Sequence, residues 1–463
     1  MAIKQITIGK VFEDSRFSSY QYLVCSLCFL VTFWDGFDLT VVGVTLPKIT
    51  EFLHSSPGAL GLALGAGQFG PLIGAIVLGM LADRWGRKWM LCISALIFGI
   101  FTLLTTTISS VEQLALYRFL AGIGLGGAVP NALTIGSEYA PWRLRASIVT
   151  AMYAGMPAGA MTGGLLAAWF IPHFGWQSLF LLGGCAPLLV ALGVAVFLPE
   201  SLEFMVRRGT ARDKKRVREI IAKIAPALAE DEDVHFVSET KRLPGVPVGR
   251  LFSEGRARIT LLLWIICTTA LYLLWILNTW SPTLLRNSGA TVEQYSLAYA
   301  CLCFGAVVAS IFIGRSMDKY NPFRVLQVGF LLASLSLVVF GLSAGSGSFL
   351  LIAVLSVFCG ICINGSQTGT LAVATLSYPS DIRATGLGWA YAIAKVGAML
   401  APIMGGYLLS HNWSVSEICS VNALVGVFTA AVLVVLQRHV ASQGLLKRQV
   451  VEVKVEIKDD LNG

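Results

Sequence analysis

Residues 79–91 read Gly79-Met-Leu-Ala-Asp-Arg-Trp-Gly-Arg-Lys-Trp-Met-Leu91, and a related stretch lies 235 positions later, Gly314-Arg-Ser-Met-Asp-Lys-Tyr-Asn-Pro-Phe-Arg-Val-Leu326. A second echo pairs Arg145-Ala146 with Arg383-Ala384 at an offset of 238. Each is a short charged stretch beside long apolar ones. A repeat spaced by about half the chain indicates two matching halves, which is an arrangement typical of membrane transporters.

The apolar segments around these stretches are long enough to cross a bilayer, which takes roughly 20 residues of helix. Twelve can be drawn, at residues 20–46, 57–82, 89–109, 112–137, 146–171, 177–198, 259–285, 294–316, 323–344, 348–376, 384–409 and 415–437. One long polar interval separates the first six from the last six. We therefore predict an all-α membrane protein with 12 transmembrane helices in two pseudo-symmetric six-helix bundles.

This division predicts five parts of the chain. They are an N-terminal tail over 1–19, a first bundle over 20–198, a linker over 199–258, a second bundle over 259–437 and a C-terminal tail over 438–463. Within the linker, Asp213 to Ile224 has a helical pattern that fits either a helix on the membrane surface or a solvated segment, and we favour the solvated segment.

The composition supports a membrane protein and explains its net charge. The chain is 56% hydrophobic and 13% charged, whereas soluble proteins carry about 25% charged residues. The net charge is +8, but 30 of the 34 basic residues fall in the tails, the linker and the loops of one side. Lys and Arg stay in cytoplasmic loops, so we predict cytoplasmic termini and linker, a multi-pass protein of the bacterial inner membrane, and no nucleic-acid partner.

The ten cysteines all fall in apolar segments. Cys25 with Cys28, and Cys359 with Cys362, have the Cys-x-x-Cys spacing, but no His or second pair accompanies either. We therefore predict small core residues rather than a metal site.

The stretch at 79–88, Gly-x-Leu-Ala-Asp-Arg-x-Gly-Arg-Lys, resembles the loop 2–3 signature of the major facilitator superfamily, and the resemblance covers essentially the whole chain. It implies the major facilitator fold and a transporter rather than an enzyme. In such a loop a glycine allows close helix approach, and an Asp facing basic residues can latch the halves through charge-assisted hydrogen bonds. The predicted gating residues are Gly79, Asp83, Arg84, Gly86, Arg87, Lys88, Asp318, Arg145 and Arg383.

Three further stretches are similar to the aromatic acid:proton symporters of that superfamily: Phe33-Trp-Asp-Gly-Phe-Asp38, Glu138-Tyr-Ala-Pro-Trp-Arg-Leu-Arg145 and Arg383-Ala-Thr-Gly-Leu-Gly-Trp389. The resemblance implies proton-coupled import of a small aromatic carboxylate, such as a hydroxybenzoate, by alternating access. The chain departs from it at Lys395, where much of the family has Arg. Lysine cannot make the two-pronged contact of arginine with a carboxylate, which bears on the substrate more than on the mechanism.

Four ionisable residues form the predicted proton-coupling set: Asp35, Asp38, Arg118 and Glu138. A charge at mid-bilayer costs on the order of 3 kcal/mol or more, so each needs a function or a partner. Asp35 and Asp38 share one face of a helix, with a glycine between them that leaves room for a close approach. Two such carboxylates do not readily stay ionised together, so the pair is expected to take up a proton; the alternative is that one of them only holds the bundle together.

Arg118 cannot lose its proton and therefore needs an anion. The candidates are Asp35, Asp38, Glu138 and a substrate carboxylate. A permanent Asp partner would make Arg118 structural, whereas competition with a substrate would make it a switch. Glu138 lies near the cytoplasmic end of its span, which favours a role in gating.

Lys395 is the one charge away from the ends of the predicted helices of the second half, and together with Arg118 it would let an anionic substrate engage both halves. A lysine that extends to the membrane surface is the alternative. Aromatic rings and amides are predicted to line the same site, although each also fits helix packing or an interface anchor. These residues are Trp34, Phe37, Gln68, Asn131, Tyr272, Trp275, Asn278, Asn364, Gln367, Trp389 and Tyr391.

Other functions of such a fold remain open at this point. They are import of a non-aromatic anion or a sugar, drug export by proton antiport, and a receptor without transport. The stretch Gly155–Gly164 is similar to the antiporter motif of the superfamily but has Ala160 in place of its Pro, which favours import. No nucleotide-binding loop or catalytic motif appears, so we predict that the protein needs no cofactor. We also predict a monomeric protein with protons as its coupling ion.

Overall fold

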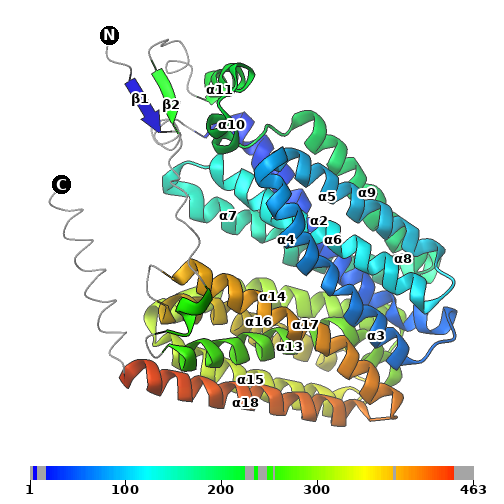
Figure 1. The fold of residues 1–463 in the computed structure, drawn as a ribbon. Helices are drawn as coiled ribbons and strands as arrows, with labels where there is room; N and C mark the ends of the chain where they lie inside the picture. The colour runs from blue at the N-terminus through cyan, green and yellow to red at the C-terminus, as the bar shows by residue number, and fades with distance from the viewer. Residues whose placement is uncertain are drawn as a thin grey trace. The chain divides into compact units, whose positions relative to one another are not determined.

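The computed structural model describes residues 4–7, 17–224, 234–237, 248–253, 256–378 and 382–442. In these ranges 12 helices are long and apolar enough to cross a membrane (Figure 1). The predicted fold class of two six-helix bundles is confirmed, with one addition in the polar segments that is described below.

The spanning helices of the first half are α2 (Ser19–Phe52), α3 with α4 (Pro57–Gly67 and Phe69–Trp85), α5 (Arg87–Leu104), α6 (Val111–Glu138), α7 with α8 (Arg145–Tyr153 and Gly155–Phe174) and α9 (Gln177–Phe197). Those of the second half are α13 (Ala257–Asn287), α14 (Val292–Lys319), α15 (Pro322–Ser343), α16 (Phe349–Ser377), α17 (Arg383–Ser410) and α18 (Val415–Ser442). Short 3₁₀ turns cover Thr105–Thr107, Trp142–Leu144 and Val248–Leu251.

Prolines explain the two spans that are divided. Pro71 has no amide hydrogen to donate to the carbonyl of Gly67, and α3 ends at Gly67. In the same way Pro157 cannot donate to the carbonyl of Tyr153, where α7 ends.

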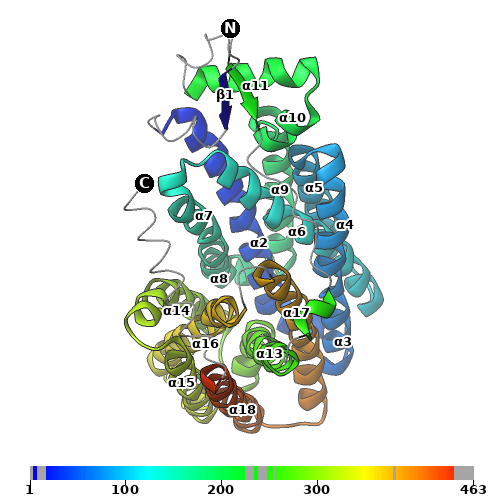
Figure 2. The same ribbon diagram turned by 60° about the vertical axis from the view of Figure 1, so that its left-hand side comes forward.

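The helices pair in the same pattern within each half. In the first half α2 packs against α8, α4 against α6, and α5 against α6 and α9; in the second, α13 packs against α17, α14 against α16, and α15 against α16 and α18 (Figure 2). Contacts group residues 1–55 with 62–243 as one unit and 56–61 with 244–463 as the other. The repeated pairing is the structural counterpart of the sequence repeat.

The contact between α2 and α8 is a backbone contact made possible by glycine. A Cβ atom at Gly36 would overlap the carbonyl oxygen of Met156, and one at Gly159 would overlap that of Phe33. Thr40 Oγ1 donates to the carbonyl of Ala160 across the same contact, at 2.9 Å. Helix α8 is therefore what approaches the glycine between the two aspartates.

The linker is structured where it follows α9. Helices α10 (Leu202–Arg208) and α11 (Ala211–Ile224) lie at one end of the first unit, beside the two strands (Figure 1). Val217, Ile221 and Ile224 are buried in the same apolar cluster as Leu198. The preference for a solvated segment was therefore wrong for Asp213 to Ile224, because one face of this helix is apolar enough to pack onto the first unit.

Two short strands are the exception to the all-α prediction. Strand β1 (Lys4–Thr7) pairs in parallel with β2 (Val234–Val237), with Lys4 opposite Val234. Both fall in segments predicted as polar tail and linker. Backbone N–H and C=O groups outside the helices can form their hydrogen bonds between two such strands.

Candidate substrate and proton-coupling site

A buried ion pair joins α2 and α6 inside the first unit. The side chains of Arg118 and Asp38 are 7% and 2% exposed. Arg118 Nη1 donates to Asp38 Oδ1 at 3.0 Å, and Nη2 donates to Asp38 Oδ2. Asp38 is therefore the partner of Arg118 among the carboxylates that the sequence analysis proposed. The two groups meet in the two-pronged geometry that suits a guanidinium and a carboxylate.

Three neighbouring helices contribute to the surroundings of the pair. Thr102 on α5 donates to Asp38 Oδ1 at 3.5 Å, and the ring of Phe180 on α9 lies 6.0 Å from the guanidinium carbon of Arg118. A Cβ at Gly67, where α3 ends, would lie 3.3 Å from that of Arg118. The sequence analysis missed Thr102 and Phe180, because a threonine and a phenylalanine in apolar helices carry no distinguishing signal.

The other predicted residues of α2 lie close to Asp38. Asp35 is half-buried one turn earlier. Phe37 is fully buried in the helix packing, and half-buried Trp34 has its ring 5.0 Å from that of Phe37. The structure thus places Trp34 and Phe37 in an aromatic row that continues to Phe33.

Two predicted amides of the first unit take different positions. Gln68 is half-buried at the break between α3 and α4, next to Gly67. Asn131 is buried and donates to the carbonyl of Gly127 on its own helix at 2.8 Å.

In the second unit Lys395 is half-buried on α17, with its ammonium nitrogen 5.1 Å from the centre of the Tyr391 ring. Among the residues that the structure describes, no carboxylate lies within ion-pairing distance of it. An ammonium group held on an aromatic face in this way remains available to an anion.

The remaining predicted residues lie on α13, α16 and α17 of the same unit. Asn278 accepts a hydrogen bond from Tyr299 at 3.2 Å, and Asn364 donates to the carbonyl of Gly360 at 3.1 Å. Trp389 stacks on Trp264 with ring centres 6.5 Å apart. Tyr272, Trp275 and Gln367 are half-buried.

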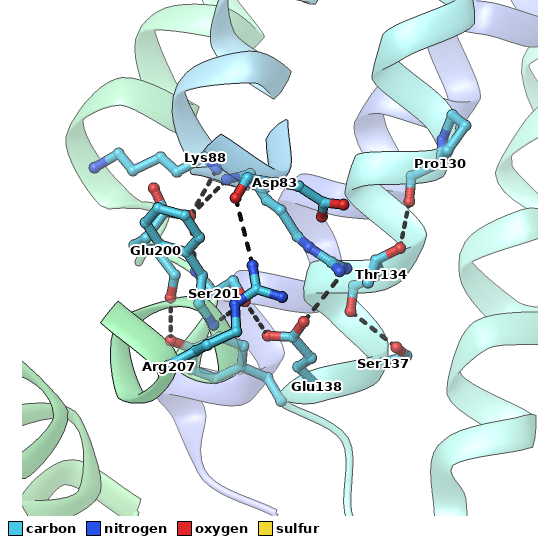
Figure 3. A network of polar contacts seen from close by, with 12 residues as sticks. Asp83, Lys88, Pro130, Thr134, Ser137, Glu138, Glu200, Ser201 and Arg207 are labelled. Carbon is cyan, nitrogen blue, oxygen red and sulfur yellow. Dashed lines mark hydrogen bonds and ion pairs between the residues drawn. The ribbon is translucent and has the colours of Figure 1, made fainter. Parts of the chain in front are cut away.

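A second polar network lies at the end of the first unit where α4 meets α5 (Figure 3). The carboxylate of Glu138, the last residue of α6, accepts from Ser201 Oγ at 2.6 Å and lies 3.4 Å from Arg87 Nη1. Glu138 is therefore bound to Arg87 at the start of α5 and to Ser201 of the linker, whereas Arg118 contacts Asp38.

Glu200 is the residue of this network that the sequence analysis missed. One oxygen of its carboxylate accepts from the backbone N–H groups of Arg87 at 2.8 Å, Lys88 at 3.0 Å and Ser201 at 2.9 Å. It thus caps the N-terminus of α5, where a negative charge is favourable. Its partners are backbone N–H groups, which no residue type in the sequence identifies. The one feature of the sequence that could have indicated this role is a carboxylate directly after the sixth apolar segment.

Gly86 is required by this cap. Its φ is 102° with ψ 149°, a region that is essentially restricted to glycine, and a Cβ there would overlap the Glu200 carboxylate. Gly79 has the opposite surroundings, since apart from its chain neighbours and the backbone of its own helix no described atom lies within 4 Å of a Cβ placed there. Close helix approach at Gly79 is therefore not observed in this structure.

The other predicted gating residues lie near the ends of helices. The backbone oxygen of Asp83 accepts from Arg207 at 3.4 Å, Arg145 Nε donates to the carbonyl of Ser137 at 2.8 Å, and Arg383 Nε donates to that of Tyr378 at 3.4 Å. Arg84 is exposed, and Lys88 lines a cavity described below. The side chain of Asp318 lies outside the described part of the structure.

Within the described ranges, no group of three or more His, Cys, Asp or Glu side chains is placed to hold a metal ion. In the first unit, one cation, Arg118, is thus neutralised by one carboxylate. In the second unit, Lys395 is a separate candidate.

Two six-helix units with a charge pair buried in a membrane-spanning region define the class of polytopic membrane transporters. The family model of the Major Facilitator Superfamily matches residues 28–288 and 263–458. The chain belongs to this superfamily of transporters, which is not an enzyme family.

Curated relatives match nearly the whole chain. The 4-hydroxybenzoate transporter PcaK of Acinetobacter baylyi is 38% identical over 432 residues, which cover 93% of each chain. The gallate transporter of Pseudomonas putida is 34% identical over 427 residues, covering 92% of this chain and 94% of the relative.

Solved structures share the fold. The crystal structure of a D-xylose-proton symporter covers 90% of this chain and 97% of its own, with a TM-score of 0.68 at 17% identity. The nucleoside transporter NupG covers 90% of this chain and 99% of its own, with a TM-score of 0.68 at 14% identity. At these identities the likeness concerns the fold alone.

Proposed function

We propose that this chain is a proton-coupled symporter that imports a small aromatic carboxylate, such as a hydroxybenzoate, by alternating access. The substrate class is supported by relatives named for 4-hydroxybenzoate and gallate transport that match more than nine-tenths of the chain. The coupling is supported by one observation above all, the buried pair of Asp38 and Arg118.

The pair can act as a switch because its two members respond differently to protons. Asp38 can be neutralised by a proton, whereas Arg118 remains charged. Protonation of Asp38 would leave a positive charge unpaired in a low-dielectric site, which is unfavourable unless another anion replaces the carboxylate. The carboxylate of the substrate is such an anion.

Lys395 supplies the second cation in this scheme. Its ammonium group would bind the substrate carboxylate, as the guanidinium of Arg118 does once Asp38 is protonated. The rings of Trp34, Trp275, Trp389 and Tyr391 offer apolar faces suited to an aromatic substrate.

The cycle then runs in four steps. Asp38 takes a proton from outside and releases Arg118, and the cations bind the substrate carboxylate. The two six-helix halves rock to the inward-facing state. Asp38 loses its proton to the cytoplasm and recaptures Arg118, which expels the substrate.

This proposal includes the setting of the protein. The termini and linker face the cytoplasm, as the positive-inside rule predicts, and the protein acts as a monomer in the bacterial inner membrane. Protons are the coupling ion, and no other cofactor takes part.

The charges limit the stoichiometry. One proton with one monoanion moves no net charge, so transport would draw on the pH gradient alone. A second proton, for which Asp35 provides a carboxylate, would add about 2.3 kcal/mol per 100 mV of membrane potential.

Substrate class is tested by competition in proteoliposomes that contain the purified chain. Uptake of labelled 4-hydroxybenzoate should be inhibited by other hydroxybenzoates and by benzoate, but not by an aliphatic acid of equal charge or by xylose. Inhibition by the aliphatic acid or the sugar alone would favour another importer, and uptake that requires a reversed proton gradient would indicate an exporter.

A further inference from the structure

A cavity of about 280 Å³ lies at the end of the first unit, where α4 meets α5, and its lining does not include Asp38, Arg118 or any other residue of the proposed transport site. Its walls come from the start of α2, the α4–α5 junction, the segment between α9 and α10, and the helices α10 and α11. The linker helices therefore form one side of it, and a charged loop of the transport core forms the other.

The lining of the cavity has more cations than carboxylates. Lys88, Arg216 and Lys223 line it, and among the described residues none of them has a carboxylate within ion-pairing distance. Lys88 is close enough to Glu200 to be attracted by its carboxylate and close enough to Arg216 to be repelled by it. Figure 3 shows the Lys88 side chain extending away from the Glu138 carboxylate, so its charge is not used in that network.

Two of the three carboxylates in the lining are already engaged. That of Glu200 caps α5. That of Asp213 accepts from Arg208 at 2.5 and 2.6 Å and from Thr210 at 2.5 Å, and these contacts lower the pKa of Asp213 to about 2. Glu219 is the third, so three cations face a single carboxylate that is not engaged in this way.

The lining of the cavity also contains two exposed tryptophans at the level where the spanning helices end. Trp85 and Trp89 in its lining are 61% and 53% exposed, at the ends of two spanning helices. Tryptophan is enriched where a spanning helix leaves the hydrocarbon region, at the level of the lipid headgroups.

We propose that this cavity binds a phosphate anion through Lys88, Arg216 and Lys223, carried either by the headgroup of an acidic phospholipid or by a soluble phosphate ester. Clusters of Lys and Arg on an amphipathic helix beside a spanning segment attract such groups. A bound phosphate would join α11 to the loop between α4 and α5, which carries the predicted gating residues.

The test compares four forms of the full-length purified chain in detergent: wild type, Arg216→Gln with Lys223→Gln, Glu219→Gln, and a control with Lys214→Gln and Lys215→Gln. The control removes two exposed cations of the same helix that do not line the cavity. Binding of dioleoylphosphatidylglycerol, with dioleoylphosphatidylcholine as comparison, is measured by native mass spectrometry. Circular dichroism confirms that each form is helical.

Wild type and control should retain one phosphatidylglycerol in preference to phosphatidylcholine. The double variant at Arg216 and Lys223 should bind it about 30-fold more weakly, since each cation near an anionic headgroup contributes about a five-fold factor. Glu219→Gln should bind it more tightly, because a repulsive charge is removed.

Thermal unfolding with added inorganic phosphate, at constant ionic strength, distinguishes the two sources. Stabilisation by phosphate that is lost in the double variant would assign a soluble ester, and stabilisation by the lipid alone would assign a headgroup. Equal binding by the double variant and the control, with either probe, would overturn the proposal.

Discussion

Arg118 on α6 holds the carboxylate of Asp38 on α2 with both of its terminal nitrogens, at a place where the two side chains are 7% and 2% exposed. Removing two charges from water costs several kcal/mol per ion, so such a pair is weak evidence of a purely stabilising role. It is, however, an arrangement in which one proton changes the net charge of a buried site.

The pair predicts a double-mutant cycle that separates stability from transport. Arg118→Gln and Asp38→Asn should each lower the stability of the folded chain, by roughly 3–5 kcal/mol when the remaining charge stays buried and unpaired. The double variant should recover much of this loss because no unpaired charge remains, yet it should not transport. Apparent unfolding temperatures and uptake, measured on the same preparations, check both statements.

If the double variant transported as well as the wild type, the pair would be structural only. If neither single variant were destabilised, the pair would not be buried as described.

Lys395 is expected to be needed for transport and not for folding. Lys395→Ala should reduce substrate uptake to background while membrane insertion and the unfolding temperature remain close to wild type. Lys48→Ala is the matched control, since Lys48 pairs with Glu51 at the surface and such pairs contribute little. Unchanged uptake by Lys395→Ala would exclude it as a substrate ligand.

Two glycines of the loop signature should differ in their tolerance of alanine. Gly86→Ala should destabilise the chain by about 1–3 kcal/mol, because its backbone conformation is nearly exclusive to glycine and the new Cβ would displace the Glu200 carboxylate. Gly79→Ala should leave the unfolding temperature unchanged or raise it, since the site is open and alanine favours helix. Equal effects of the two substitutions would contradict the described cap.

The docking of α11 should depend on the ionised form of Asp213. Contacts with Arg208 and Thr210 lower the pKa of Asp213 from 3.8 to about 2, so its contribution to stability is complete above pH 3.8 and is lost as the pH falls toward 2. Asp213→Asn should therefore speed amide hydrogen exchange in residues 211–224 at pH 7, whereas the protection of wild type should persist down to about pH 4.

Exchange that is equally slow in Asp213→Asn would show that the helix is held by its apolar face alone. Loss of wild-type protection between pH 7 and 5 would mean that another group controls the docking.

Much of this architecture was predictable from the sequence because bilayer crossing imposes a strong pattern. Helices α4 and α14 end in the repeated charged stretches, and the long polar interval separates the halves at the place where α9 ends. The breaks in α3–α4 and α7–α8 were not predicted, although Pro71 and Pro157 account for them.

The sequence could not show whether Asp35 or Asp38 is the partner of Arg118. The two residues share a helix face, and the rotation of α2 is set by backbone contact with α8 at Gly36, which becomes visible only in three dimensions. The role of Glu200 was hidden for a similar reason, because its carboxylate binds backbone N–H groups. The packing of α11 was underestimated because its charged face dominated its composition.

The most direct test of the central claim is uptake of labelled 4-hydroxybenzoate into proteoliposomes with and without an inward proton gradient, for wild type and Asp38→Asn. The gradient should accelerate uptake by the wild type and have no effect on Asp38→Asn, because the variant has no proton to exchange for Arg118. Equal acceleration of both forms, or a wild type that does not respond to the gradient, would contradict proton coupling through Asp38.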